Sequence, residues 1–127
     1  MSVSYSAVAS LYRSTNKDRM EIAKIGFRSD GTEGFSTDID FSDVTKQPNL
    51  PMSCVSPNIN DIQFLSLICT GGGTATVRLT SGNNVGKYID MDVTNGSFLM
   101  SGIHLTGIIV VAVSGLGYLE IKGSGVK

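Results

Sequence analysis

The chain has no tryptophan and only one histidine among its 127 residues. Any Ser-His-Asp, Cys-His or multi-histidine metal arrangement would therefore have to use His104. This residue lies between two aliphatic residues and follows Ser101 and Gly102, where a structural role at a strand edge accounts for it. We accordingly expect no catalytic residue, and the chain is predicted not to be an enzyme.

Two motifs resemble ligand sites but fail on spacing. The stretch Gly82 to Tyr88 contains glycines and a lysine, but Tyr88 occupies the place where a phosphate-binding loop has a magnesium-coordinating Ser or Thr. A hairpin turn explains this stretch.

Asp38, Asp40 and Asp43 have oxygen-ligand chemistry, but a calcium loop would have glycine at position 43 and a bidentate acid further on. We predict no metal site and no cofactor.

Charge is nearly balanced, with a formal net charge of −1. Nucleic acids and anionic membrane surfaces are bound by proteins with a basic excess, so neither is an expected partner. The first residues contain no basic region followed by an apolar stretch, and no apolar run approaches a membrane span. We expect synthesis in a cytoplasm without a signal peptide. Cys54 and Cys69 are then expected to be reduced, with Cys69 acting as a small buried hydrophobe.

The second half of the chain is poor in charge. Residues 61–127 contain only eight charged side chains: Asp61, Asp90, Asp92, Glu120, Arg78, Lys87, Lys122 and Lys127. A β surface with so few charges must be covered if the protein is not to aggregate. We therefore predict a homo-oligomer.

Apolar residues in this half occur in short runs rich in Val, Ile and Thr, separated by glycine-containing breaks. Alternation puts one face of 74–80 and of 87–93 inward, whereas 62–69 and 105–113 are apolar on both faces. Glycines 71–73 are expected to close a hairpin from 62–69 to 74–80, and Asn95-Gly96 a second hairpin from 87–93 to 98–100. The predicted fold is all-β, an antiparallel β-sandwich or jelly-roll-like barrel with an extended N-terminal arm.

The first sixty residues are organised differently. Residues 1–20 have weak periodicity and are predicted to form the arm, with a short helix possible between 4 and 18; residues 21–127 form the sandwich domain. Residues 21–28 alternate as its first, half-buried strand. The acidic stretch around Ile39 and Phe41 fits an edge strand. Residues 44–60, with three prolines, are predicted to be a long loop without regular structure.

The arm and the loop contain apolar residues that have no evident place in the core. We predict that they bind a partner: Tyr5, Leu11, Tyr12, Leu50 and Met52. Ordering such segments on a partner costs conformational entropy that the buried contacts must exceed.

The segments 74–79, 88–92 and 96–100 and the closing run 117–123 carry a resemblance. From about residue 61 onward the chain resembles small all-β structural proteins of tailed-phage virions, particularly head decoration or cement proteins. It shares their low charge, their Gly/Ser/Thr-rich turns and an N-terminal extension. The resemblance implies a non-enzymatic subunit of the virion that oligomerises, often as a trimer, and clamps major capsid or other shell proteins together.

A glycan- or receptor-binding sandwich is the alternative, because such modules present exposed aromatic rings to sugars. Four tyrosines could serve: Tyr5, Tyr12, Tyr88 and Tyr118. A structural subunit would bury its low-charge surface permanently, whereas a binding module would keep most of it in water and use one patch.

Overall fold

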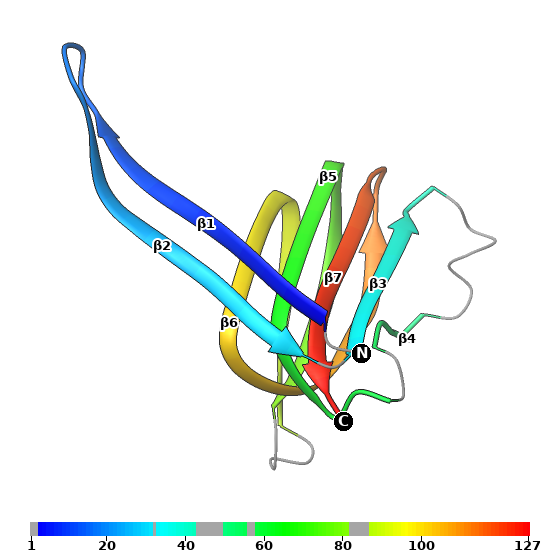
Figure 1. The fold of residues 1–127 in the computed structure, drawn as a ribbon. Helices are drawn as coiled ribbons and strands as arrows, with labels where there is room; N and C mark the ends of the chain where they lie inside the picture. The colour runs from blue at the N-terminus through cyan, green and yellow to red at the C-terminus, as the bar shows by residue number, and fades with distance from the viewer. Residues whose placement is uncertain (1–2, 32, 43–49, 56–57, 82–86) are drawn as a thin grey trace.

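The computed structural model describes residues 3–31, 33–42, 50–55, 58–81 and 87–127. Within these residues the chain forms strands and no helix (Figure 1). The strands are β1 (Val3–Ser14), β2 (Arg19–Gly31), β3 (Glu33–Asp40), β4 (Met52–Ser53), β5 (Asp61–Ser81), β6 (Tyr88–Ser114) and β7 (Tyr118–Val126). The all-β prediction is confirmed, and the helix considered for residues 4–18 is replaced by β1.

Strands β3 to β7 form one continuous sheet in the order β3-β7-β5-β6-β4, which bends so that β5 and β6 serve two layers. The β3 layer contains β3, β7, the first half of β5 (61–70) and the middle third of β6 (96–105). The β4 layer contains β4, the last third of β6 (107–114), the second half of β5 (74–81) and the first third of β6 (88–94). Partner numbers fall along β6 as they rise along β5, so these pairings are antiparallel.

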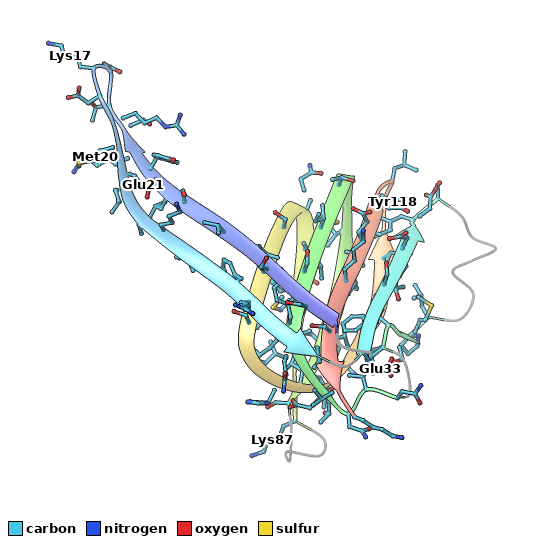
Figure 2. The ribbon with its side chains drawn as sticks, viewed as in Figure 1. Lys17, Met20, Glu21, Glu33, Lys87 and Tyr118 are labelled. Atoms are coloured by element: carbon cyan, nitrogen blue, oxygen red, sulfur yellow. The ribbon has the colours of Figure 1, made fainter. Side chains whose placement is uncertain are left out.

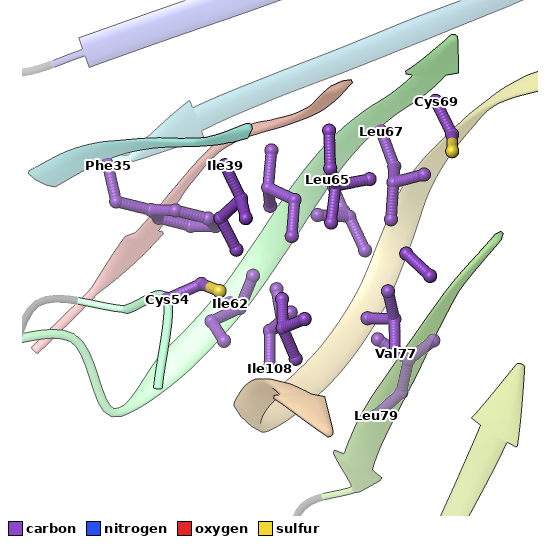
Figure 3. Packing of buried hydrophobic residues seen from close by; sticks show 14 of the residues in the cluster. Phe35, Ile39, Cys54, Ile62, Leu65, Leu67, Cys69, Val77, Leu79 and Ile108 are labelled. Carbon is purple, nitrogen blue, oxygen red and sulfur yellow. The ribbon is translucent and has the colours of Figure 1, made fainter. Parts of the chain in front are cut away.

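The two layers enclose the core, as Figure 3 shows for Leu65 and Leu67 from one layer and Val77 and Ile108 from the other. From the first half of β5 onward to β7, the chain changes layer at every passage except one. The second half of β5 and the first third of β6 are consecutive and pair with each other in the β4 layer. The last strand, β7, returns to lie beside the first, β3. This alternation between two antiparallel layers is the jelly-roll arrangement, and the prediction of a sandwich or jelly-roll-like barrel is confirmed.

The predicted hairpins at Gly71–Gly73 and at Asn95-Gly96 are wrong. The first half of β5 pairs with β7 and with the middle third of β6, whereas the second half pairs with the other two thirds. These glycine-containing breaks are corners at which the chain crosses between layers. Gly71, Gly72 and Asn95 have positive φ at these corners, of 96°, 90° and 44°. The Oδ1 of Asn95 accepts a hydrogen bond from Gly72 N at 2.8 Å. The corners of β5 and β6 are thereby joined.

The third corner, between β6 and β7, lies against the first. A Cβ on Gly73 would be 2.6 Å from the carbonyl oxygens of both Ser114 and Leu116 and 2.8 Å from the Phe41 ring. Phe41 extends the β3–β7 ladder, since its N–H donates to Gly117 O at 2.9 Å. Only a residue without a side chain fits where these backbones meet.

Two bulges set which residues face the core. Gln63 has no partner on β7, and Val111 has none on β5. Because a bulge reverses the alternation that follows it, Ile62 and Leu65 both point inward although they are three residues apart. This explains why 62–69 looked apolar on both faces. Phe64 lies on the outer face and is nevertheless 3% exposed.

Strands β1 and β2 form a separate antiparallel sheet, the N-terminal hairpin. The strand expected at residues 21–28 is present within β2, but it pairs with β1 and lies outside the sandwich. The foot of the hairpin contacts β5, β6 and β7, and a Cβ on Gly31 would come within 2.7 Å of Gly125 O. Phe64 and Ser124, both on the outer face of the β3 layer, are buried on this side. The far end stands clear of the sandwich (Figure 1).

The segment predicted to be an irregular loop contains β4, whose Met52 and Ser53 pair with Val110 and Ile109. Residues 43–49 and 56–57 of this segment lie outside the described residues. Cys54 is buried and its N–H donates to Ile108 O at 2.9 Å. The segment therefore closes one edge of the β4 layer.

Both cysteines are free and buried. Burial raises the pKa of the Cys54 thiol to about 11, an effect that its interaction with the Val110 backbone partly opposes. Since the thiolate is the reactive species, a buried thiol with a raised pKa is inert near neutral pH.

We predict that Gly73→Ala lowers the free energy of unfolding by about 1–3 kcal/mol, because the new methyl group meets two carbonyl oxygens that belong to backbone. Urea denaturation measures this change. Gly26→Ala is the matched control, since nothing lies within 4 Å of its added Cβ. Equal effects of the two substitutions would contradict the close approach at the corner.

We also predict that neither thiol reacts with a disulfide reagent in the folded protein at pH 8, whereas both react rapidly in denaturant. Absorbance of the released thiolate follows the reaction. Between pH 9, the ordinary pKa of a thiol, and about pH 11, Cys54 loses its proton in the unfolded chain but keeps it in the folded one. The free energy of unfolding therefore falls as the pH rises through this range. Rapid labelling at pH 8 would show that the segment around β4 opens readily.

Candidate assembly interface

The N-terminal hairpin pairs over its whole length, from Val3 opposite Gly31 to Ser14 opposite Arg19. The register shifts once, because Leu11 lies opposite Ala23 whereas Tyr12 lies opposite Glu21. Ile22 is left without a partner at this bulge. A two-stranded hairpin alone is at most marginally stable in water, so the extended end is expected to gain from contact with another surface.

Strand alternation gives the hairpin two chemically different faces. The pairs Ala9–Ile25, Leu11–Ala23 and Arg13–Met20 share one face with Ala7–Phe27, and this apolar face runs along the ribbon. The opposite face carries serines, Lys24 and Tyr12, together with the apolar residues Val8 and Ile22. There the Arg19 guanidinium lies 4.1 Å from the centroid of the Tyr12 ring.

Large apolar side chains on this hairpin are exposed to water. The exposed fraction is between 52 and 64% for Val8, Leu11, Met20, Ile22 and Ile25. Full burial of such a side chain contributes about 1.5–3 kcal/mol, so completing the burial of the three half-exposed ones on the apolar face, Leu11, Met20 and Ile25, would supply about 2–5 kcal/mol. Leu11, Met20 and Ile25 lie on the apolar face, whereas Val8 and Ile22 lie on the opposite one. Isolated exposed hydrophobics need no explanation, but a row of them along one face of a projecting ribbon marks an interaction surface.

The structure divides the five residues predicted to bind a partner. Leu11 and Tyr12 lie exposed on β1, and Tyr5 lies in β1 opposite Ser29, with only its backbone described. Leu50 and Met52 pack against the core. The expectation that these two have no place in the core is wrong, because the loop folds over the edge of the β4 layer.

Sequence reasoning missed the exposed residues of β2, Met20, Ile22 and Ile25. The alternation of Ala23, Ile25 and Phe27 was correctly read as a strand, but its apolar face was assigned to the core. Alternation shows that one face is apolar and does not show what covers it.

The outer surface of β3 and β7 is acidic. Asp38 lies directly opposite Glu120, and Asp40 lies opposite Tyr118. Partial burial, followed by the carboxylates of Asp38 and Glu120, raises the pKa of Tyr118. Asp40 Oδ1 accepts hydrogen bonds from Ser42 N at 3.0 Å and from Ser42 Oγ at 2.7 Å. Asp43 lies outside the described residues.

The outer surface of the β4 layer is a ladder of polar pairs between β5 and β6. Thr76 Oγ1 donates to Asp92 at 2.6 Å, and Arg78 donates to both carboxylate oxygens of Asp90 at 2.8 and 3.1 Å. The Arg78 hydrogen bonds lower the pKa of Asp90. The same guanidinium lies 3.8 Å from the centroid of the Tyr88 ring. These side chains satisfy one another across the strands.

The only histidine is exposed and pairs with a carboxylate. His104 Nδ1 lies 3.0 Å from Asp61 Oδ1, and Gln63 Nε2 donates to Asp61 Oδ2 at 3.0 Å. Partial burial acts to raise the pKa of Asp61, but the hydrogen bonds from Gln63 and His104 outweigh it and lower that pKa. Within the described chain these contacts join β5 to β6, and no nucleophile is among them.

Cavities in the described residues are small and open. One of them, of about 440 Å³, is a hollow beside the hairpin turn and is lined by Arg13, Thr15, Asp18, Arg19 and Met20. Among the residues with described positions, no three His, Cys, Asp or Glu side chains converge as metal ligands. No helix long and apolar enough to cross a membrane occurs in that part of the chain.

Comparison of the sequence with protein-family models and with curated proteins gives no match, and comparison of the fold with solved structures gives none either. Inference about function therefore depends on the residues and geometry described above.

We predict that Leu11→Ser with Met20→Ser leaves the free energy of unfolding of the dilute protein within about 1 kcal/mol of the original, because both side chains are exposed. Leu65→Ala, at a position with 0% exposure, should cost about 2–5 kcal/mol. Chemical denaturation at low micromolar concentration compares them. A loss of several kcal/mol in the double variant would mean that the hairpin is part of the folding core.

Proposed function

We propose that this protein is a non-enzymatic structural subunit of a viral particle, of the kind that stabilises or decorates a phage capsid. The observation that carries the proposal is a compact jelly roll bearing a projecting hairpin with an exposed apolar face. The sandwich supplies a rigid body. The hairpin supplies apolar surface whose burial stabilises a complex once another molecule covers it.

The fold reduces the number of function classes that need to be compared. Jelly rolls occur in viral capsid proteins, lectins and cupins. A cupin-type metal site built from several histidines is incompatible with a single histidine, and His104 is engaged with Asp61 at the surface. The fold is therefore compatible with the virion and the carbohydrate-binding alternatives.

The tyrosines favour the structural role. A sugar-binding ring needs an open face, but Arg78 covers one face of Tyr88 and Arg19 covers one face of Tyr12. Tyr118 interacts with the surrounding carboxylates. A glycan- or receptor-binding module remains the second candidate, with Tyr88 and Tyr118 as its exposed rings.

In this proposal the partners are further copies of the chain and a capsid or other virion protein, and the protein resides in the virion. The hairpin contributes apolar contact to these interfaces, and the charge-poor sandwich tolerates close packing of neighbours. Buried area of about 1,200–2,000 Å² is what a specific interface of this kind requires.

Fractionation of particles from cells that produce the chain tests the proposal. We expect the protein to sediment with the particle at a fixed ratio to the shell protein, and we expect the variant Leu11→Ser with Met20→Ser to remain mostly in the unassembled fraction. Lys87→Gln, an exposed change away from the hairpin, is the control and should assemble normally (Figure 2).

Absence of the protein from purified particles would contradict the virion role. If the purified chain also bound glycans on an array, and Tyr88→Ala or Tyr118→Ala abolished that binding, the sugar-binding alternative would replace it.

A further inference from the structure

The hairpin and strand β3 carry opposite charge. Residues 3–31 contain five basic and three acidic side chains, whereas β3 contains three acidic side chains and no basic one. Figure 2 shows Lys17, Met20 and Glu21 at the far end of the hairpin, well separated from Tyr118, which lies beside β3. Among the described contacts, Lys17 and Lys24 form no ion pair. The two surfaces are complementary in charge, and β2 and β3 lie in different sheets of the same copy.

Strand β3 is the edge of its layer and has a surplus of negative charge. It pairs with β7 alone among the described strands. Asp38 and Glu120 lie opposite each other on the same face, a like-charge arrangement that destabilises neighbouring strands. Lys122, opposite Ser36, is the one basic residue on that face of β7. A further cation beside Asp38 would relieve the repulsion.

The backbone of β3 has hydrogen-bonding groups that point away from β7. Phe41 N–H donates to Gly117 O, and N–H groups alternate in direction along an antiparallel strand. The N–H groups of Ser36 and Asp38 therefore point to the open edge. Such an edge accepts an added strand whose main chain completes the ladder.

Strand β2 has the matching features. It pairs with β1 along one edge, and its alternation puts Lys24 on one face and Ala23 and Ile25 on the other. If β2 lay beside β3 with Lys24 on the side of Asp38, then Ile25 would lie on the side of the buried Phe35 and Ile39. Opposite charges would then be neighbours on one face, and apolar side chains would be neighbours on the other.

We propose that β2 of one copy adds as a strand to the open edge of β3 of a second copy, with Lys24 beside Asp38. The inference rests on the proposed function in that it names the partner of the hairpin, a second copy of this chain. Packing of the hairpin across the outer face of β3 is less favourable, because it would press the apolar face against Asp38 and Glu120. Strand addition avoids that desolvation of carboxylates.

Exchanging the charges of Lys24 and Asp38 in the purified full-length chain tests the proposed pairing of β2 with β3. We expect Lys24→Glu and Asp38→Lys each to weaken self-association at least tenfold in sedimentation experiments at low salt, and we expect the combination of both to restore it to within about threefold. Lys87→Glu makes the same charge change at the opposite end of the sandwich from Tyr118 (Figure 2) and should leave association unchanged. A monomeric parent protein, or a double variant no better than the single ones, would overturn the proposal.

Hydrogen exchange distinguishes strand addition from a simple ion pair. The amides of Ser36 and Asp38 should exchange at least tenfold more slowly in the associated parent protein than in Lys24→Glu at the same concentration. Equal exchange in both would exclude a strand at this edge. Because these measurements use the chain alone, self-association without presence in particles would refute the proposed function only, and particle incorporation without any effect of Lys24→Glu would refute this inference only.

Discussion

The close approach of three backbone segments at one corner of the sandwich is the constraint on which the rest of the structure depends. Gly73 lies against Ser114 and Leu116, and the Phe41 ring fills the remaining space. This contact lets β5 and β6 bend and run through both layers, so that the two layers have a continuous backbone. The apolar residues of each layer then meet in one core, which supplies the dominant favourable term in folding.

The same construction determines which surfaces remain available. The edges of the two layers are β3 and β4 on one side and the middle and first thirds of β6 on the other. Among the described contacts, the N-terminal hairpin meets the sandwich at its foot. The rest of the hairpin has neither a second sheet nor a core beneath it. Its apolar face is consequently left uncovered. The polar side chains around Arg78 and Asp90, in contrast, have hydrogen-bond partners within the sandwich. This contrast directs attention to the hairpin as the part that engages a partner.

The chemistry of the surface agrees with an assembly role for the protein more readily than with catalysis or sugar binding. Three of the described charged side chains have partners on the surface: His104 pairs with Asp61, Arg78 pairs with Asp90, and Arg19 lies over the Tyr12 ring. What remains unbalanced is charge between elements, basic on the hairpin and acidic on β3. In the proposed association, an imbalance of this kind would be relieved between copies, and it would give the association both direction and sensitivity to salt.

The sequence by itself determined the fold class, most of the strands other than β1 and β4, and the faces of several of them. Alternation correctly placed Ala75, Val77 and Leu79 inward, because inward and outward positions along a strand differ in polarity. It could not determine which strands pair with each other. A run of glycines looks the same in a hairpin as at a corner between layers, so 62–69 and 74–80 were wrongly paired. It also could not show that β2 lies outside the core or that Leu50 and Met52 lie against it. Tertiary structure decided these points, because burial depends on which distant segments cover a face.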